Sequence, residues 1–206
     1  MDSVRNYFPE FSAIQHEMLD RLTPLYEDWN SKINVISRKD MAYFRERHVL
    51  HSLAIYKTIQ FPEGSRILDI GTGGGFPGVP LAIANPACSF ILLDSVGKKL
   101  KVIDGVAESL GLSNIETTHE RVEKHHGSYN YLISRAVTNL ANFMRLTRHL
   151  TTKKNQNFSS IYYLKGGDFN DELRTVQMKS EVHELKKIFQ ENFFETKKIV
   201  RLSHSF

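Results

Sequence analysis

The stretch "LDIGTGGGFPG" at residues 68–78 constrains the fold more than any other part of the chain. It follows an apolar run, and it places five glycines within eight positions. Glycine lets a backbone turn tightly and approach a ligand without interference from a Cβ atom. Pro77 stands where the first turn of a following helix would begin. A strand, a glycine loop and a helix in this order are typical of the first unit of an open, parallel α/β sheet.

Apolar runs and helical patterns alternate along the chain after Gly64. The predicted strands are residues 66–70, 90–94, 114–118, 131–134 and 161–165, and the predicted helices begin at 77 or span 98–110 and 139–150. Such alternation predicts parallel βαβ units with right-handed crossovers. In the tail, residues 181–189 and 195–202 read as two strands joined by a short polar turn, so we expect an antiparallel hairpin at the C-terminal edge of the sheet.

Two helical patterns precede the first strand. From Phe11 to Trp29 apolar residues recur at steps of three and four, with Pro24 expected to kink or divide the helix. A second pattern covers residues 40–59, with Asp40 as a candidate N-cap. We therefore expect an N-terminal helical extension, residues 1–63, that packs on a core domain of residues 64–206 to form one compact unit.

Composition excludes several classes of protein. The chain has 206 residues, with 27 Lys and Arg against 23 Asp and Glu, a mildly basic balance that permits nucleic-acid binding without requiring it. It has no long apolar run, no signal-peptide pattern and a single cysteine, Cys88, so we expect a cytoplasmic monomer without disulfides or membrane spans. The histidines lack metal-ligand spacing, and His125 and His126 are expected to face solvent, so no metal is predicted.

The glycine loop lies where open parallel sheets bind ligands, beyond the carboxyl ends of the strands. Asp94 ends the next strand, where its carboxylate can accept hydrogen bonds from both hydroxyls of a ribose. The spacing Gly73-x-Gly75-x-x-Gly78 satisfies the dinucleotide fingerprint, and it also fits the looser loop of S-adenosylmethionine-dependent methyltransferases. Asp69 favours the methyltransferase, because a carboxylate suits an amino group and a sulfonium but would repel a pyrophosphate.

The residues alone leave three interpretations of this loop: a methyltransferase, which is favoured, an NAD(P)-dependent oxidoreductase, and a structural turn. Further motifs follow in the order "YEDWNSKINVISRKD", "RERHVLHSLA", "LDIGTGGGFPGVPLAIANP", "LLDSVGKKLKVI", "RVE", "ISRA" and "YLKGG". This series closely resembles the bacterial glucose-inhibited division protein B family, also called RsmG, from about Leu25 to Gly167. The "GFPG" ending of the loop is far more specific than glycine spacing.

The resemblance implies a Rossmann-like, class I methyltransferase sheet and an enzyme that uses S-adenosylmethionine to methylate N7 of a guanine in small-subunit ribosomal RNA. The cofactor-binding residues that it implies are Gly71, Gly73, Phe76, Asp94, Val122, Glu123 and Arg135. Guanine N7 carries no proton, so we expect no general base and name no catalytic residue. The basic residues predicted to contact RNA are Arg47, His48, Lys98, Lys99, Lys101, Arg135 and Lys165.

Two positions depart from the family pattern, which has Asp where this chain has His51 and Asn130. Neither is among the predicted cofactor residues, so activity remains the expectation, but any ion pair made by those carboxylates is in doubt. The C-terminal "RLSHSF" also lacks the family's usual basic finish. A further alternative is a non-catalytic RNA-binding protein that retains the fold, and the presence of Gly71, Asp94 and Glu123 argues against it.

Overall fold

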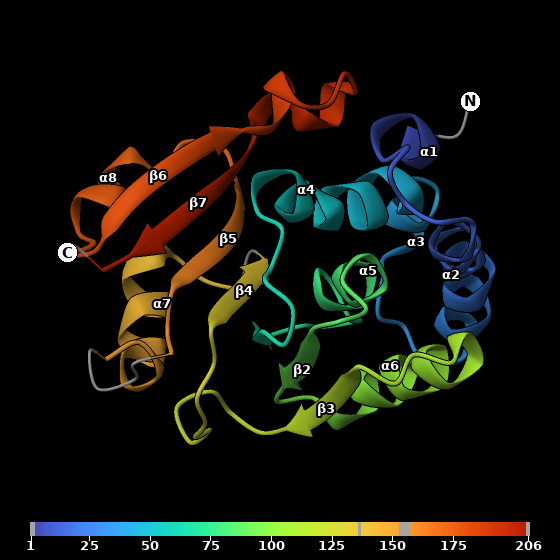
Figure 1. Cartoon of the computed structure of the whole chain (residues 1–206), viewed down its shortest axis with the longest axis horizontal. Helices are drawn as coiled ribbons and strands as arrows, with labels where there is room; N and C mark the ends of the chain where they lie inside the picture. The colour runs from blue at the N-terminus through green and yellow to red at the C-terminus, as the bar shows by residue number, and fades with distance from the viewer. Residues whose placement is uncertain (1–2, 136, 153–156, 205–206) are drawn as a thin grey trace.

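The computed structural model describes residues 3–135, 137–152 and 157–204. Within these ranges one sheet runs through the molecule, with seven strands in the order β3-β2-β1-β4-β5-β7-β6 (Figure 1). The strands are β1 (Arg66–Ile70), β2 (Ser89–Asp94), β3 (Ile115–His119), β4 (Tyr131–Arg135), β5 (Ser160–Gly166), β6 (Lys179–Glu184) and β7 (Lys197–Ser203). Ala136, the last residue of the "ISRA" motif, lies outside the described ranges, as do the last two residues of the "RLSHSF" tail.

The first five strands are parallel, as the alternating pattern predicts. β1 pairs with β2 on one side and with β4 on the other, so the strand order reverses at β1. Ile70, the last residue of β1, is in register with Leu93 and Ser134. The loop at residues 71–78 therefore leaves the sheet at its topological switch point, where the sequence places it.

The C-terminal hairpin is confirmed, but its connection differs from the prediction. β7 lies antiparallel between β5 and β6. β6 ends at Glu184, and two short 3₁₀ turns, Leu185–Lys187 and Asn192–Thr196, precede β7. Leu185, Phe189 and Phe194 are at most 2% exposed, so the apolar residues that resemble a strand continuation instead anchor a folded connection to the core.

The N-terminal layer contains α1 (Ser3–Tyr7), α2 (Ala13–Lys32), α3 (Arg38–Met41), a π-helical turn η1 (Arg45–Leu50) and α4 (His51–Thr58). Ser12 caps α2 in a capping box with Gln15, which satisfies two backbone N–H groups at the start of the helix. The helix continues through Pro24, so the expected division there is wrong. The second predicted helix is instead split into three segments, with a π-helical turn that leads directly into α4.

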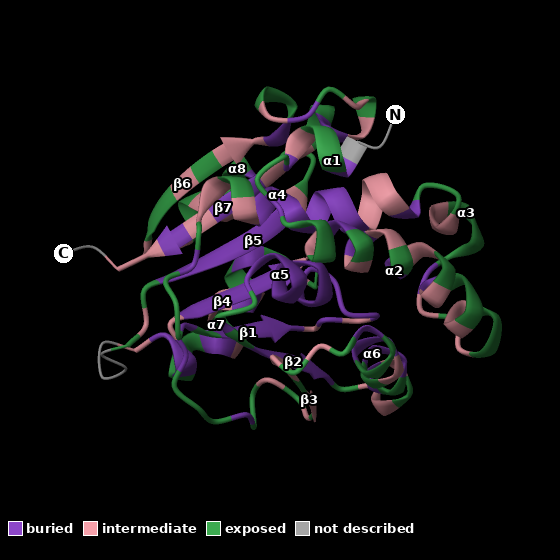
Figure 2. Ribbon diagram, turned by 45° about the vertical axis from the view of Figure 1, so that its right-hand side comes forward, coloured by how far each residue is buried: buried purple, intermediate pink, exposed green. Residues whose placement is uncertain are grey.

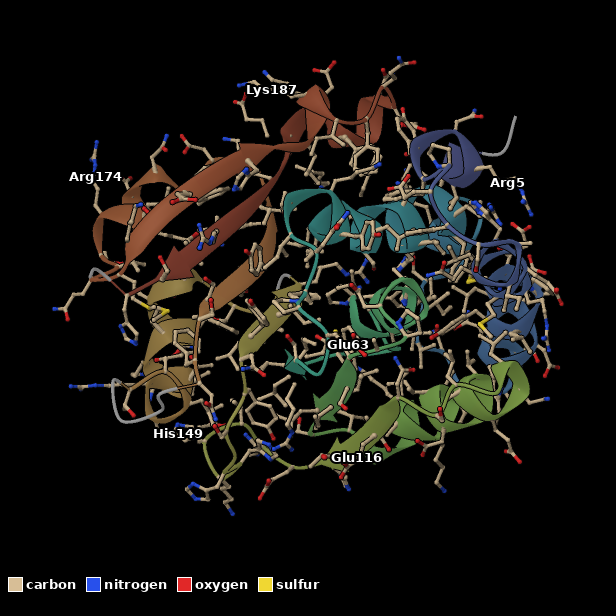
Figure 3. The ribbon with its side chains drawn as sticks, viewed as in Figure 1. Arg5, Glu63, Glu116, His149, Arg174 and Lys187 are labelled. Carbon is tan, nitrogen blue, oxygen red and sulfur yellow. The ribbon has the colours of Figure 1, made fainter. Side chains whose placement is uncertain are left out.

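Helices cover both faces of the sheet (Figure 2). One face is covered by the N-terminal helices together with α5 (Gly78–Ala84) and α6 (Gly97–Leu110). The other face is covered by α7 (Leu140–Thr147) and α8 (Asn170–Arg174). Successive strand residues alternate between the two cores, since Ile67 joins the first cluster and Leu68 the second. Charged side chains such as those of Arg5, Glu116 and Lys187 point outward at the periphery (Figure 3).

The N-terminal helices share the hydrophobic cluster of the sheet. Leu22 of α2 and Leu53 of α4 are fully buried in the same cluster as Leu92 of β2. The helices therefore cover apolar surface that the parallel sheet would otherwise expose. The boundary between residues 63 and 64 stays a prediction. Among the described residues, no helix combines the length and apolar character needed to span a bilayer.

Candidate functional site

The backbone after β1 takes a shape that favours glycine at two predicted cofactor positions. Gly71 and Gly73 have φ angles of +67° and +61°. The N–H groups of Gly71 and Thr72 both donate to the Leu93 carbonyl, at 2.9 and 3.0 Å, which fixes the loop over the end of β2. A Cβ atom on Gly71 would lie 2.6 Å from Val137 Cγ2, whereas one on Gly73 would meet nothing within 4 Å.

Asp94 joins this loop to the end of β2. Its Oδ2 accepts a hydrogen bond from the Gly73 N–H at 2.9 Å, and its Oδ1 accepts one from the Val96 N–H at 2.8 Å. The side chain is ordered by these bonds and is 7% exposed. Because each carboxylate oxygen can accept more than one hydrogen bond, Asp94 can still bind hydroxyl groups at the pocket that it borders.

Asp69 has a structural role that the sequence interpretation missed. It is fully buried, and its Oδ2 accepts hydrogen bonds from the Thr72 hydroxyl at 2.6 Å and the Gly78 N–H at 2.8 Å. Burial raises the pKa of this carboxyl from 3.8 to about 7, although the two hydrogen bonds oppose the shift. The expectation that Asp69 faces a ligand's amino group is therefore wrong, because the carboxyl holds the two ends of the glycine loop together.

A pocket of about 340 Å³ lies beside the loop, at the carboxyl ends of β1, β2 and β3. It brings together four of the predicted cofactor residues: Gly71, Asp94, Val122 and Glu123. Its wall includes the apolar side chains of Val137 and Leu146. Lys99, predicted to contact RNA, also lines this pocket. The pocket thus combines an apolar slot, a carboxylate and bare glycine backbone.

The loop after β3, which carries Val122 and Glu123, is held by a buried histidine. His125 Nδ1 lies 2.9 Å from Glu120 Oε2, and its Nε2 lies 2.6 Å from the Tyr129 hydroxyl. His125 is 7% exposed, so the expectation that it faces solvent is wrong. The sequence contained a weak signal for this role, because Glu120 and Tyr129 flank the histidine on either side. His126 is exposed, as predicted.

The side chains of Arg135 and Phe76 contact each other outside the lining of this pocket. The Arg135 guanidinium donates to the Arg47 carbonyl and bonds His48 Nδ1, each at 3.0 Å, and lies 5.4 Å from the centre of the Phe76 ring. The Phe76 ring is 2% exposed and packs 4.9 Å from the ring of Tyr26. Contacts from Arg135, Phe76 and Gly73 to a cofactor stay predictions.

Burial determines the protonation states of His48 and Arg135. Burial and the neighbouring Arg135 lower the pKa of His48 to about 3, so the imidazole is neutral and can accept the Arg135 hydrogen bond. Burial also lowers the pKa of Arg135 to about 10, which leaves the guanidinium charged at neutral pH. A cation is thus fixed at the end of β4, close to the switch point of the sheet.

The other predicted RNA contacts are dispersed. Arg47 pairs with Asp40 at 2.8 Å, and Lys165, at the end of β5, pairs with Glu172 at 2.8 Å. Lys98 and Lys101 are exposed on the first turns of α6. These lysines border the same edge of the sheet as the pocket, whereas the Arg47 and Lys165 side chains are already engaged by carboxylates.

Of the two departures from the family pattern, Asn130 is hydrogen-bonded, whereas the buried Nε2 of His51 has no hydrogen-bond partner among the described residues. Asn130 Oδ1 accepts a hydrogen bond from the Arg66 N–H at 2.8 Å, and its amide donates to the Asn157 carbonyl at 3.2 Å. His51 is buried with its ring 5.3 Å from that of Phe193, and burial holds its pKa well below the usual value. Both side chains are therefore uncharged at neutral pH and need no ionic partner.

Comparisons with known proteins agree with the interpretation of this site as one that binds a cofactor. The GidB family model, described as rRNA small subunit methyltransferase G, matches residues 15–200. The chain belongs to this family. A Ribosomal RNA small subunit methyltransferase G from Christiangramia forsetii is 47% identical over 98% of this chain and 96% of its own length. A protein of the same name from Bacteroides thetaiotaomicron is 44% identical over 97% of this chain and 98% of its own length.

Solved structures share the fold of this GidB family member. A SAM dependent methyltransferase from Aquifex aeolicus superposes with a TM-score of 0.59 at 14% identity, covering 82% of this chain and 100% of that one. Precorrin-6y C5,15-methyltransferase from Geobacter metallireducens gives a TM-score of 0.53 at 12% identity, covering 84% and 92%. The predicted Rossmann-like methyltransferase sheet is thereby confirmed. Among the described residues, no three His, Cys, Asp or Glu side chains gather as metal ligands.

The pocket suits the adenosine part of S-adenosylmethionine. The apolar side chains of Val122 and Leu146 in the pocket lining suit a flat ring, and the Asp94 carboxylate matches two adjacent ribose hydroxyls. Gly71 offers backbone without a side chain, so a ligand can approach the loop closely. The donors and acceptors present in this GidB family member therefore fit the cofactor.

Proposed function

We propose that this protein transfers a methyl group from S-adenosylmethionine to N7 of a guanine in small-subunit ribosomal RNA. The observation that carries the proposal is the pocket at the switch point, where Gly71 and Asp94 meet in a chain of the GidB family. We further propose that the protein acts as a cytoplasmic monomer, on the RNA alone or within a ribosomal particle.

Each predicted cofactor residue has a role in this proposal. Asp94 accepts hydrogen bonds from the ribose hydroxyls, while Val122 and Glu123 border the adenine. Gly71 and Gly73 shape the backbone beside the methionine part. Phe76 and Arg135 support the loop from behind through their mutual contact, which favours positioning over direct binding in this arrangement.

Bound S-adenosylmethionine supplies a methyl group on a positively charged sulfur. Guanine N7 has an in-plane lone pair and no proton, so the protein needs no general base. Its task is to hold N7 in line with the methyl group at about 3 Å, where positioning alone accelerates transfer. N7 must face the methyl group, so an arginine fork to N7 and O6 together is excluded. Arg135 ends β4 and Lys165 precedes the last residue of β5, and they are the candidates to contact O6. To do so, Arg135 would have to leave the Arg47 carbonyl and His48, and Lys165 would have to leave Glu172.

Two other functions give different results in a binding experiment. An NAD(P)-dependent oxidoreductase would be stabilised by NAD(P). A non-catalytic RNA-binding protein would be stabilised neither by NAD(P) nor by S-adenosylhomocysteine. The proposed methyltransferase is stabilised by S-adenosylhomocysteine, by about 2.7 kcal/mol at a concentration of one hundred times Kd. The absence of a shift in Tm with millimolar S-adenosylhomocysteine would count against the proposal.

The substrate is tested by incubation with methyl-labelled S-adenosylmethionine and purified ribosomal RNA. We expect label in small-subunit RNA and not in large-subunit RNA, whether the substrate proves to be the free RNA or the assembled subunit. Asp94→Ala should abolish incorporation, because it removes the predicted ribose contact. Equal labelling of both RNAs would contradict the proposed specificity.

A further inference from the structure

Four side chains form a row of alternating aromatic and cationic groups near the loop. The Arg47 guanidinium lies 4.1 Å from the centre of the Tyr43 ring and 5.7 Å from that of Phe193. On Phe193, the ammonium of Lys197 lies 4.7 Å from the ring centre. We call Tyr43, Arg47, Phe193 and Lys197 the aromatic row.

The aromatic row joins two segments that are far apart in the sequence. Tyr43 and Arg47 come from the region between α3 and α4, and Phe193 and Lys197 come from the connection that leads into β7. The folded form of that connection, which sequence patterns did not predict, brings Phe193 to the N-terminal layer. The row is therefore a feature of the tertiary structure.

The row lies at the carboxyl edge of the sheet. Lys197 begins β7 and is in register with Gly166, the last residue of β5. The Arg47 carbonyl accepts a hydrogen bond from Arg135, the last residue of β4. The pocket uses the ends of β1, β2 and β3, so the row borders the other half of the same edge.

The row is partly open to solvent and keeps an uncompensated charge. The Tyr43 side chain is 49% exposed, one of few large apolar side chains so exposed in the described part of the chain. Asp40 neutralises Arg47. Within the described residues, Lys197 Nζ has no carboxylate partner. Tyr43 therefore stays exposed although Arg47 stacks on its ring, and Lys197 contacts the Phe193 ring but no described carboxylate.

We propose that the aromatic row binds single-stranded RNA next to the target guanine, with a base stacked on Tyr43 and a phosphate at Lys197. This inference rests on the proposed function, because it assigns the RNA contact of the same site. Exposed aromatic rings and arginine planes bind unstacked bases, and an ammonium group binds the backbone. A duplex buries its base faces, so the row selects single strands.

The test measures binding of a short, fluorescently labelled single-stranded RNA by anisotropy, with the same strand annealed to its complement as the comparison. Tyr43→Ala should weaken single-strand binding about five- to one-hundredfold, the usual effect of losing one stacked base. Tyr43→Phe keeps the ring and should bind within about twofold of the wild type. Tyr43→Leu keeps apolar bulk and should resemble Tyr43→Ala.

Lys197→Ala should lower the slope of log Kd against log salt by about 0.7, the value for one phosphate on a single strand. Lys179→Ala is the matched control, because Lys179 is in register with Ser203, at the opposite end of β7. It makes the same charge change and should leave the slope as in the wild type. Every variant should keep the wild-type Tm shift with S-adenosylhomocysteine, since none of these residues lines the pocket.

The outcomes separate this inference from the proposed function. If the wild type methylates ribosomal RNA but Tyr43→Ala and Lys197→Ala bind single strands as the wild type does, the aromatic row is not the RNA contact. If Tyr43→Leu binds as well as the wild type, apolar bulk and not stacking explains the contact, and the inference fails. If the wild type shows no methyl transfer, the proposed function fails, whatever the binding data show.

Discussion

The Asp94 carboxylate accepts a hydrogen bond from the Gly73 N–H at 2.9 Å, which links the end of β2 to the glycine loop after β1. The bond explains why an acidic residue and a glycine loop separated by a helix belong to one site. Asp94 orders the loop and borders the pocket at the same time. Changes at this residue should therefore affect both the order of the loop and the binding of the ligand.

We expect Asp94→Asn to weaken binding of S-adenosylhomocysteine by about tenfold or more, because an amide NH₂ cannot accept the hydrogen bonds that the carboxylate oxygens accept. Isothermal titration calorimetry measures the change. Asp104→Asn is the control: Asp104 is an exposed acid on α6, bonded to the Thr117 hydroxyl at 2.8 Å. Equal affinities for the Asp94→Asn variant and the wild type would refute the role of the carboxylate.

Alanine should be tolerated differently at Gly71 and at Gly73. Both have positive φ, which costs a residue with a side chain about 1–2 kcal/mol. Gly71→Ala should cost more than Gly73→Ala, since only the Cβ at 71 would collide with Val137. Adding Val137→Ala to Gly71→Ala should restore part of the unfolding free energy, measured in urea. A double variant no more stable than Gly71→Ala alone would show that the collision is relieved in another way.

The buried carboxyl of Asp69 should make stability depend on pH. Its pKa of about 7 in the folded protein lies above the ordinary 3.8, so the folded state holds a proton that the unfolded state releases. The resulting stabilisation is complete below about pH 4 and is lost as the pH rises to about 7, by at most about 4 kcal/mol.

Asp69→Asn removes this titration, so the difference in Tm between wild type and variant should change steadily between pH 4 and 7 and then level off. Differential scanning calorimetry across this range measures it. A difference in Tm that does not vary with pH would mean that the folded and unfolded states bind the proton equally.

Gly105 provides a test of how the N-terminal layer packs on the core. A Cβ at this position in α6 would overlap the Trp29 ring of α2. Alanine normally stabilises a helix interior by about 1 kcal/mol relative to glycine, but overpacking costs about 1–3 kcal/mol, so Gly105→Ala should lower stability. In a Trp29→Leu background the same change should cost less. Increased stability of the Gly105→Ala variant would contradict this packing.

Local sequence patterns predicted the parts of the molecule that local physics determines. The alternation of apolar runs placed β1, β2, β3, β4 and β5 within one residue at both ends. Glycines and Asp94 located the pocket, because the switch point of a parallel sheet follows from strand order. The resemblance added Val122 and Glu123, which spacing alone would leave in an ordinary loop.

The features that sequence patterns missed depend on how side chains pack in three dimensions, even where their partners are near in the sequence. Asp69 appeared to face a ligand, but Thr72 and Gly78 enclose its carboxyl. His125 appeared exposed, but Glu120 and Tyr129 bury it. The tail appeared to be a simple hairpin, because apolar residues that pack against α4 and apolar residues of a strand look alike in one dimension. Asp69 and His125 find hydrogen-bond partners within a few residues, but their burial depends on the packing of the folded chain and not on periodicity.

The identity of the methylated atom tests the central claim most directly. After incubation with methyl-labelled S-adenosylmethionine, small-subunit RNA is digested to nucleosides and the labelled nucleoside is identified by chromatography and mass spectrometry. We predict 7-methylguanosine from the wild type and no labelled nucleoside from Asp94→Ala. Label on another atom of guanine, on another base, or on no nucleoside at all would contradict the proposed reaction.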